Sequence, residues 1–144
     1  MKPVDDNQML QYIHKTGQMG QKSLGRVLQY PVSQALQKEL REQQQEYKEL
    51  AAMSGAMLRR RGQRPRNISR ALDMAMHVHL KAEMLKDRSP AAVADMITHG
   101  NAMGLSKSIR HLNHYKGHNE NIRTLAVRLM RTEKYGMDAM KPFL

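Results

Sequence analysis

Two short breaks constrain this chain more than any other feature, because each joins two long segments with helical periodicity. The first break is the dipeptide Tyr30-Pro31 and the second is Gly117. The residue before a proline avoids the helical region, and glycine commonly ends a helix. Each break is so short that the helices on either side of it must fold back on one another. We therefore expect two antiparallel helical hairpins.

Apolar residues recur at three- and four-residue steps through five segments, and no segment shows the two-residue alternation of a strand. Pro3, Asn67 and Ser89-Pro90 stand where the first, third and fourth helices are expected to begin. The expected helices cover residues 4–28, 31–61, 68–87, 90–115 and 119–141. We predict a single all-α domain over residues 1–144, an antiparallel four-helix bundle in which residues 68–87 form a fifth helix that crosses between the hairpins.

Four glycines fall on the predicted buried faces of the first and fourth helices: Gly17, Gly20, Gly100 and Gly104. Each costs roughly 1 kcal/mol relative to alanine in a helix interior, so each needs a close neighbour or a hollow beside it. The two hairpins also repeat weakly. Ile13, Met19-Gly20 and Leu28 recur at the same spacing as Ile97, Met103-Gly104 and Leu112.

Three polar side chains interrupt the apolar faces of the second and fifth helices: Gln43, Tyr47 and Glu133. Counting outward from the two breaks places Gly17 opposite Gln43 and Gly100 opposite Glu133, near the middle of the bundle. One interpretation is a structural network in which Glu133, with a raised pKa, bonds to Gln43 and Tyr47. The other is a ligand pocket formed by this layer and the four glycines.

Basic residues suggest a second kind of site. The net charge is +11 at pH 7, which favours polyanion partners. Six arginines gather between the second and third helices and are candidates for phosphate contacts, or else solvated side chains at a helix end: Arg59, Arg60, Arg61, Arg64, Arg66 and Arg70. Aromatic residues are only 4% of the chain, so any nucleic-acid binding would depend on the backbone phosphates.

Metal and catalytic sites receive little support. His111, His114 and His118 follow helical spacing and are the candidate metal ligands, but histidines also suit a helix C-terminus. The chain has no cysteine, no glycine-rich phosphate loop and no triad. We expect no enzyme and no cofactor apart from this candidate metal. The 13 methionines, including Met53 and Met103, are interpreted as core residues.

The chain also resembles a known family. The runs ADMITHGNAMGLSKSIRHLNHYKG and LAVRLMRTEKYGMDAMKPFL, together with EQQQEYKELA, are similar to a family of uncharacterised bacterial proteins with a ferritin-like four-helix bundle. The resemblance covers residues 9–144. It implies the bundle but no activity, because ferritin-like proteins with two metals carry Glu-x-x-His motifs that this sequence lacks.

Three functions follow as hypotheses. The first is a non-enzymatic bundle that acts through its surface or by self-association. The second is a polyanion-binding protein, and the third is an altered ferritin-like site that binds one metal or a small ligand. The first ten residues lack the apolar region of a signal peptide and no segment is apolar enough to span a membrane, so a cytoplasmic location is expected.

Overall fold

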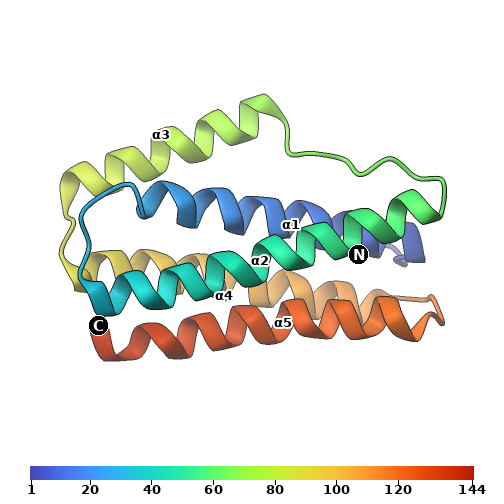
Figure 1. Cartoon of the computed structure of the whole chain (residues 1–144). Helices are drawn as coiled ribbons and strands as arrows, with labels where there is room; N and C mark the ends of the chain where they lie inside the picture. Colours follow the sequence, from blue (N-terminus) through green and yellow to red (C-terminus); the bar gives the residue numbers. More distant parts are fainter.

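The computed structural model describes residues 1–144 and contains five α-helices and no β-strand (Figure 1). The helices are α1 (Asp6–Val27), α2 (Gln34–Arg60), α3 (Arg70–Lys86), α4 (Pro90–His114) and α5 (Glu120–Met140), and a 3-10 turn, η1 (Lys141–Phe143), follows α5. The prediction of an all-α chain with five helices is confirmed. Each observed helix end lies within three residues of the expected one.

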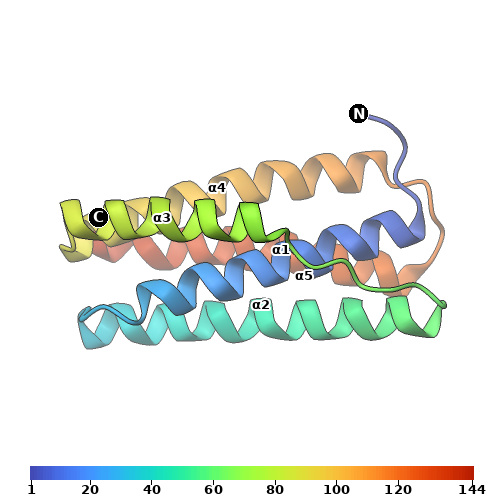
Figure 2. The same ribbon diagram turned by 90° about the horizontal axis from the view of Figure 1, so that it is seen from above.

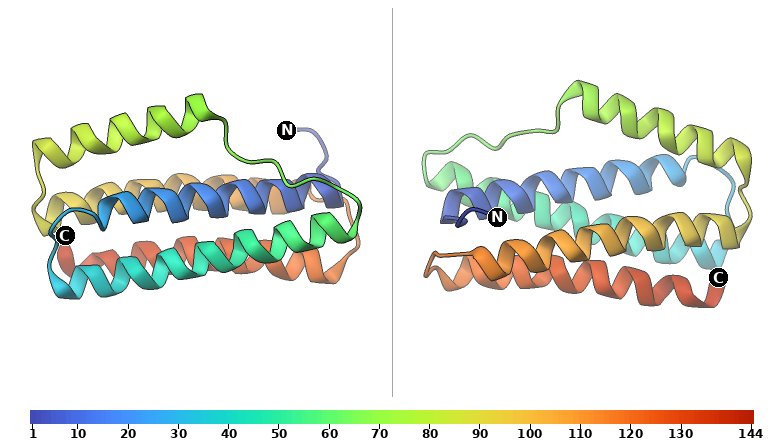
Figure 3. Two further views of the ribbon diagram at one scale, coloured as in Figure 1. Left: turned by 45° about the horizontal axis from the view of Figure 1, so that its top comes forward. Right: turned by 180° about the vertical axis from the view of Figure 1, so that it is seen from behind.

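Helices α1 and α2 run antiparallel side by side, and so do α4 and α5 (Figures 1 and 3). Contacts of α2 and α1 with α5 join the two pairs. Helix α3 packs against α1 and carries the chain back along the molecule, so α4 starts at the same end as α2. Seen from above, α3 lies over the space between α1 and α4 (Figure 2).

Side chains fix the start of every α-helix. The N-cap residues, each accepting a hydrogen bond from a backbone N–H in the first turn, are Asp5, Ser33, Ser69, Ser89 and Asn119. Ser89 and Pro90 were predicted correctly, whereas Pro3 and Asn67 were not the starting residues. Asn67 instead accepts a hydrogen bond from the Gln18 amide at 2.7 Å, which leaves Ser69 to cap α3.

One apolar core runs through the molecule and is built from the facing sides of α1, α2, α4 and α5. Helix α3 contributes only Leu80 and Met84 to it. Met9, Met84 and Met140 are almost fully buried, as a methionine-containing core requires. Met53 and Met103, which were expected on buried faces, are 46% and 64% exposed. Methionine therefore serves the surface as well as the core of this protein.

The N-terminal segment joins the loop between α4 and α5. Val4 donates to the His114 carbonyl and accepts from the Lys116 amide, both at 2.9 Å. The Tyr115 hydroxyl donates to Asp6 Oδ1 at 2.5 Å. A Cβ at Gly117 would overlap this Asp6–Tyr115 pair, so glycine is required at the break by close approach.

Candidate functional site

The centre of the candidate site is the carboxyl group of Glu133 on α5, a residue that is only 1% exposed. Burial raises its pKa to about 7, and the hydrogen bond from Ser108 partly opposes this change. The prediction that Glu133 is buried with a raised pKa is confirmed. At neutral pH this group can therefore exist in both its protonated and its ionised form.

The hydrogen-bond partners of Glu133 differ from those predicted. The Ser108 hydroxyl on α4 donates to Glu133 Oε1 at 2.5 Å, and the Ser108 and Tyr12 hydroxyls lie 3.0 Å apart. Neither Gln43 nor Tyr47 contacts the carboxyl through a hydrogen bond, so the predicted bonds between them are wrong. The other oxygen, Oε2, accepts no hydrogen bond from the protein.

Gln43 and Tyr47 belong to a separate buried network. Tyr47 donates to Asn101 Oδ1 at 3.2 Å, and the Asn101 amide donates to Gln43 Oε1 at 3.4 Å. The Gln43 amide in turn donates to the Gly136 carbonyl at 3.4 Å. Asn101 was not predicted as a site residue. It lies next to Gly100 in the chain, and its side chain lies between α2 and α5 on the same buried face of α4 as Ile97 and Ser108.

The four glycines have different roles. A Cβ at Gly17 would come within 2.8 Å of the Tyr47 carbonyl oxygen, and a Cβ at Gly20 within 2.6 Å of the Tyr47 ring. A Cβ at Gly104 would overlap the carboxyl group of Glu133. Gly100 is exposed, and a Cβ there would meet no atom within 4 Å, so its predicted burial is wrong; it lies beside a hollow, which is one of the two surroundings predicted for it.

Between α1 and α4 lies a cavity of about 590 Å³ that reaches down to Glu133. We call it the groove. Tyr47 and Glu133 lie among its buried lining residues, and Gly100 and Gly104 line the side formed by α4. The remaining lining residues are Tyr12, Lys15, Thr16, Met19, Gly20, Ser23, Leu72, Met103, Lys107 and His111. The groove thus combines apolar surface with one buried carboxyl group and two exposed ammonium groups.

His111 lies at one end of the groove. Its ring stacks on that of Tyr12, with centroids 3.6 Å apart and planes 15° apart. Burial lowers the His111 pKa, although the hydrogen bond of its Nδ1 with the Lys107 carbonyl opposes this. His114 Nδ1 bonds to the Arg110 carbonyl, and His118 is exposed beyond the helix end. No three histidine or carboxylate side chains converge anywhere in the chain, so the candidate trio His111, His114 and His118 does not form a metal-binding cluster.

The arginines between α2 and α3 lie on a segment whose backbone is held against α1. Gln11 donates to the Arg64 carbonyl at 2.8 Å and accepts from the Arg66 amide at 2.9 Å. Arg61 is engaged, since it bonds to Asn7 at 2.7 Å and to Asp6 at 3.3 Å. The other five are exposed and pair with no carboxylate: Arg59, Arg60, Arg64, Arg66 and Arg70.

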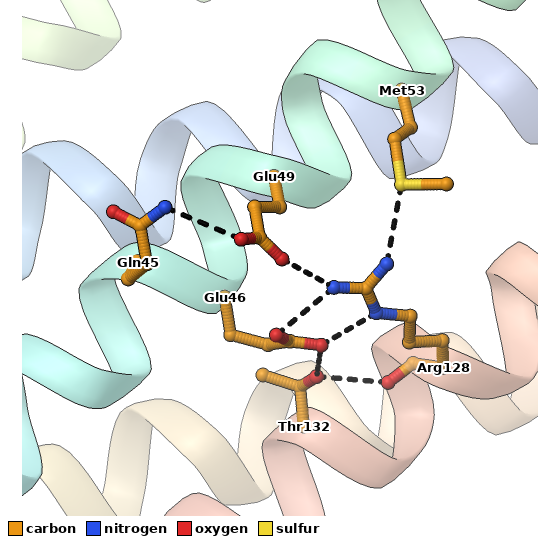
Figure 4. A network of polar contacts seen from close by, with 6 residues as sticks. All are labelled: Gln45, Glu46, Glu49, Met53, Arg128 and Thr132. Carbon is orange, nitrogen blue, oxygen red and sulfur yellow. Dashed lines mark hydrogen bonds and ion pairs between the residues drawn. The ribbon is translucent and has the colours of Figure 1, made fainter.

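A second charged cluster joins α2 to α5 and was missed by the sequence analysis (Figure 4). Arg128 binds Glu46 through two nitrogens, at 2.6 and 3.0 Å, and Glu49 at 2.7 Å. The hydrogen bonds that Arg128 donates to Glu46 raise the Arg128 pKa further above its usual range. The sequence contains one indication of this cluster, because Glu46 and Glu49 are three residues apart and therefore lie on one face of a helix.

Comparison of the chain with protein-family models, curated proteins and solved structures gave no match. No helix is both long and apolar enough to cross a membrane.

Proposed function

We propose that this protein is a non-enzymatic, ferritin-like four-helix bundle that binds a small ligand in the groove between α1 and α4. The arrangement of two antiparallel hairpins joined by α3 supports the ferritin-like part of the proposal. The two-metal chemistry of such bundles does not fit these residues. Glu133 is the one carboxylate in the groove, and no cluster of three ligands surrounds it.

One observation carries the proposal. Glu133 is buried on α5, yet its Oε2 has no partner in the protein, and Gly104 leaves the space into which the carboxyl group projects. Because Glu133 lines the groove and no protein group binds Oε2, this oxygen is available to a ligand or to water there. The groove also has the volume, and the mix of apolar surface with a few polar groups, that small-molecule sites share.

The test uses 8-anilinonaphthalene-1-sulfonate, a fluorophore with an apolar body and one negative charge. Gly100→Leu fills the groove, because no atom lies within 4 Å of a Cβ at that position. Ala102→Leu adds a similar side chain to an exposed position of α4 outside the groove and is the matched control.

Saturable binding by the wild type and by Ala102→Leu, with binding lost in Gly100→Leu, is the expected result. Equal binding by both variants, or no binding by the wild type, would show that the groove is not a binding site.

The exposed arginines favour a second candidate function, which is binding to a polyanion such as nucleic acid. The triple variant Arg59→Gln, Arg60→Gln and Arg64→Gln removes three unpaired charges and leaves Arg61 bound to α1. A control triple at exposed positions of α2, Lys38→Gln, Arg41→Gln and Lys48→Gln, removes the same charge elsewhere.

Fluorescence anisotropy with a random DNA duplex should show steep salt dependence for the wild type and for the control. The slope of log K against log salt should become shallower by about 3 in the arginine triple. Identical slopes for the two triples, or no binding at low salt, would contradict this function.

A further inference from the structure

The groove continues beyond Glu133 into a second cavity beneath α3. This cavity has a volume of about 660 Å³ and shares Met19, Ser23, Gly100 and Met103 with the first. Together the two are lined along α4 from Ala92 to His111. At about 1.5 Å of rise per residue, this stretch of helix is roughly 28 Å long. The combined cavity is therefore elongated rather than round.

The two ends of this cavity differ in charge. Lys15 on α1 and Lys107 on α4 line the first cavity, and neither pairs with a carboxylate. Glu83 and Asp95 line the second cavity, beneath α3. A ligand with one negative charge would therefore place that charge between the two lysines and the rest of its body under α3.

The part beneath α3 offers mainly apolar surface. Met19, Met76, Met96 and Met103 line it together with Leu80 and Ile97. Methionine side chains are flexible and adapt to alkyl groups of different shape. A fatty acyl chain spans about 15 Å, half of the hydrocarbon thickness of a bilayer, so the combined cavity is long enough for a chain and a head group.

On these grounds we propose that the ligand of this groove is a single-chain amphiphile with a carboxylate head, such as a long-chain fatty acid, bound with its head between Lys15, Lys107 and Glu133 and its chain beneath α3. This inference rests on the proposed ligand-binding function. A protonated Glu133 donates a hydrogen bond from Oε2 to the carboxylate of the ligand, and both lysines add charge-assisted bonds. No bond is made or broken.

The experiment measures displacement of bound 8-anilinonaphthalene-1-sulfonate by three compounds below their micelle concentrations. Palmitate has the long chain and the charge, hexadecanol has the chain without the charge, and hexanoate has the charge on a short chain. Palmitate should displace the fluorophore at concentrations about tenfold lower than either of the others, because the full site needs both features.

Two variants locate the head group. Lys15→Gln with Lys107→Gln should weaken palmitate binding by about tenfold and leave hexadecanol unchanged. Lys38→Gln with Lys134→Gln removes two exposed lysines outside both cavities and should leave both ligands unchanged.

The outcomes separate this inference from the function on which it rests. If the fluorophore binds in the groove but palmitate does not displace it, or does so no better than hexadecanol and hexanoate, the groove binds another class of ligand and this inference is wrong. If palmitate weakens equally in both lysine pairs, its head does not lie between Lys15 and Lys107. If the fluorophore binds Gly100→Leu as well as it binds the wild type, the proposed ligand-binding function is itself wrong.

Discussion

Replacing Glu133 by glutamine should remove a pH dependence of stability that the buried carboxyl creates. The pKa of Glu133 is about 7 in the folded protein, against 4.5 for an unperturbed glutamate. The folded chain therefore keeps a proton that the unfolded chain releases. The stability contributed by this group is fully present below pH 4.5 and is lost as the pH rises through 7.

The size of this effect follows from the two pKa values. The difference between 4.5 and about 7 corresponds to about 3 kcal/mol at most, since each pKa unit is worth roughly 1.4 kcal/mol. The hydrogen bond from Ser108 favours the ionised form and is already included in the value of about 7. In Glu133→Gln the amide oxygen can still accept from Ser108 but the group cannot ionise. The variant should match the wild type near pH 4 and exceed its stability near pH 8.

Urea unfolding followed by circular dichroism, at several values between pH 4 and pH 8.5, measures this difference. Subtracting the two profiles cancels the other titrating groups near the site, among them Tyr12 and His111. Glu120→Gln changes an exposed carboxyl on the same helix and is the control. Its free energy of unfolding should depend on pH as that of the wild type does. A difference between Glu133→Gln and the wild type that stays constant with pH would refute the assignment of a raised pKa to Glu133.

Three further changes test the packing around the groove by denaturant unfolding at pH 7. Gly100→Ala should stabilise the protein by about 0.5–1 kcal/mol, because it gains helix propensity and meets no neighbour; a loss of stability would mean that Gly100 is enclosed. Gly104→Ala should instead destabilise the protein by about 1 kcal/mol. Displacing the Glu133 carboxyl from Ser108 costs about 1–3 kcal/mol, and the gain in helix propensity offsets only part of this cost. Equal effects of the two alanine substitutions would show that Gly104 does not lie against the Glu133 carboxyl. Arg128→Met should cost up to about 1 kcal/mol at low ionic strength and less in 1 M salt, because its two carboxylate partners on α2 lie partly in solvent; an effect independent of salt would assign the loss to packing instead.

The ends of the helices could be predicted because the residues that set them act locally. Proline and glycine end helices through their own backbone preferences, and serine caps a helix through a bond to its first turn. Pro31 and Ser89 needed no knowledge of the rest of the chain, whereas Gly117 also leaves room for the Asp6–Tyr115 pair. The failure at Asn67 has the opposite cause, because its side chain bonds to Gln18 on a helix distant in sequence.

The burial of Asn101 in place of Gly100 could not be predicted for a related reason. Residues 100–104 contain two glycines and an alanine, so few apolar side chains mark the buried face there. Asn101 counts as an outward residue in any hydropathy pattern, yet it is buried between Tyr47 and Gln43 because both can bond to it. A polar residue whose partners lie on another helix gives no periodic signal of its own.

The partners of Glu133 show a limit on counting residues outward from a turn. Such counting places Gly100 opposite Glu133, but the carboxyl reaches Gly104 and Ser108 instead. Side chains on a helix lean toward its N-terminus, and the N-terminus of α5 faces the turn at Gly117. The carboxyl group of Glu133 is therefore displaced from its Cα toward that break, in the direction of Gly104 and Ser108.

The weak repeat between the hairpins places a methionine and a glycine from each hairpin at the groove. Met19-Gly20 and Met103-Gly104 occupy equivalent positions in the repeat and line the groove from α1 and α4. Gly20 leaves space for the Tyr47 ring of its partner helix α2, and Gly104 leaves space for the Glu133 carboxyl of its partner helix α5. Each hairpin thus uses a glycine to let one polar side chain of its second helix reach the groove, and a methionine beside the glycine to supply apolar surface. One hairpin thus places a phenol and the other a carboxyl in the groove, beside Lys15 and Lys107, and the two glycines leave the space that the phenol and the carboxyl occupy.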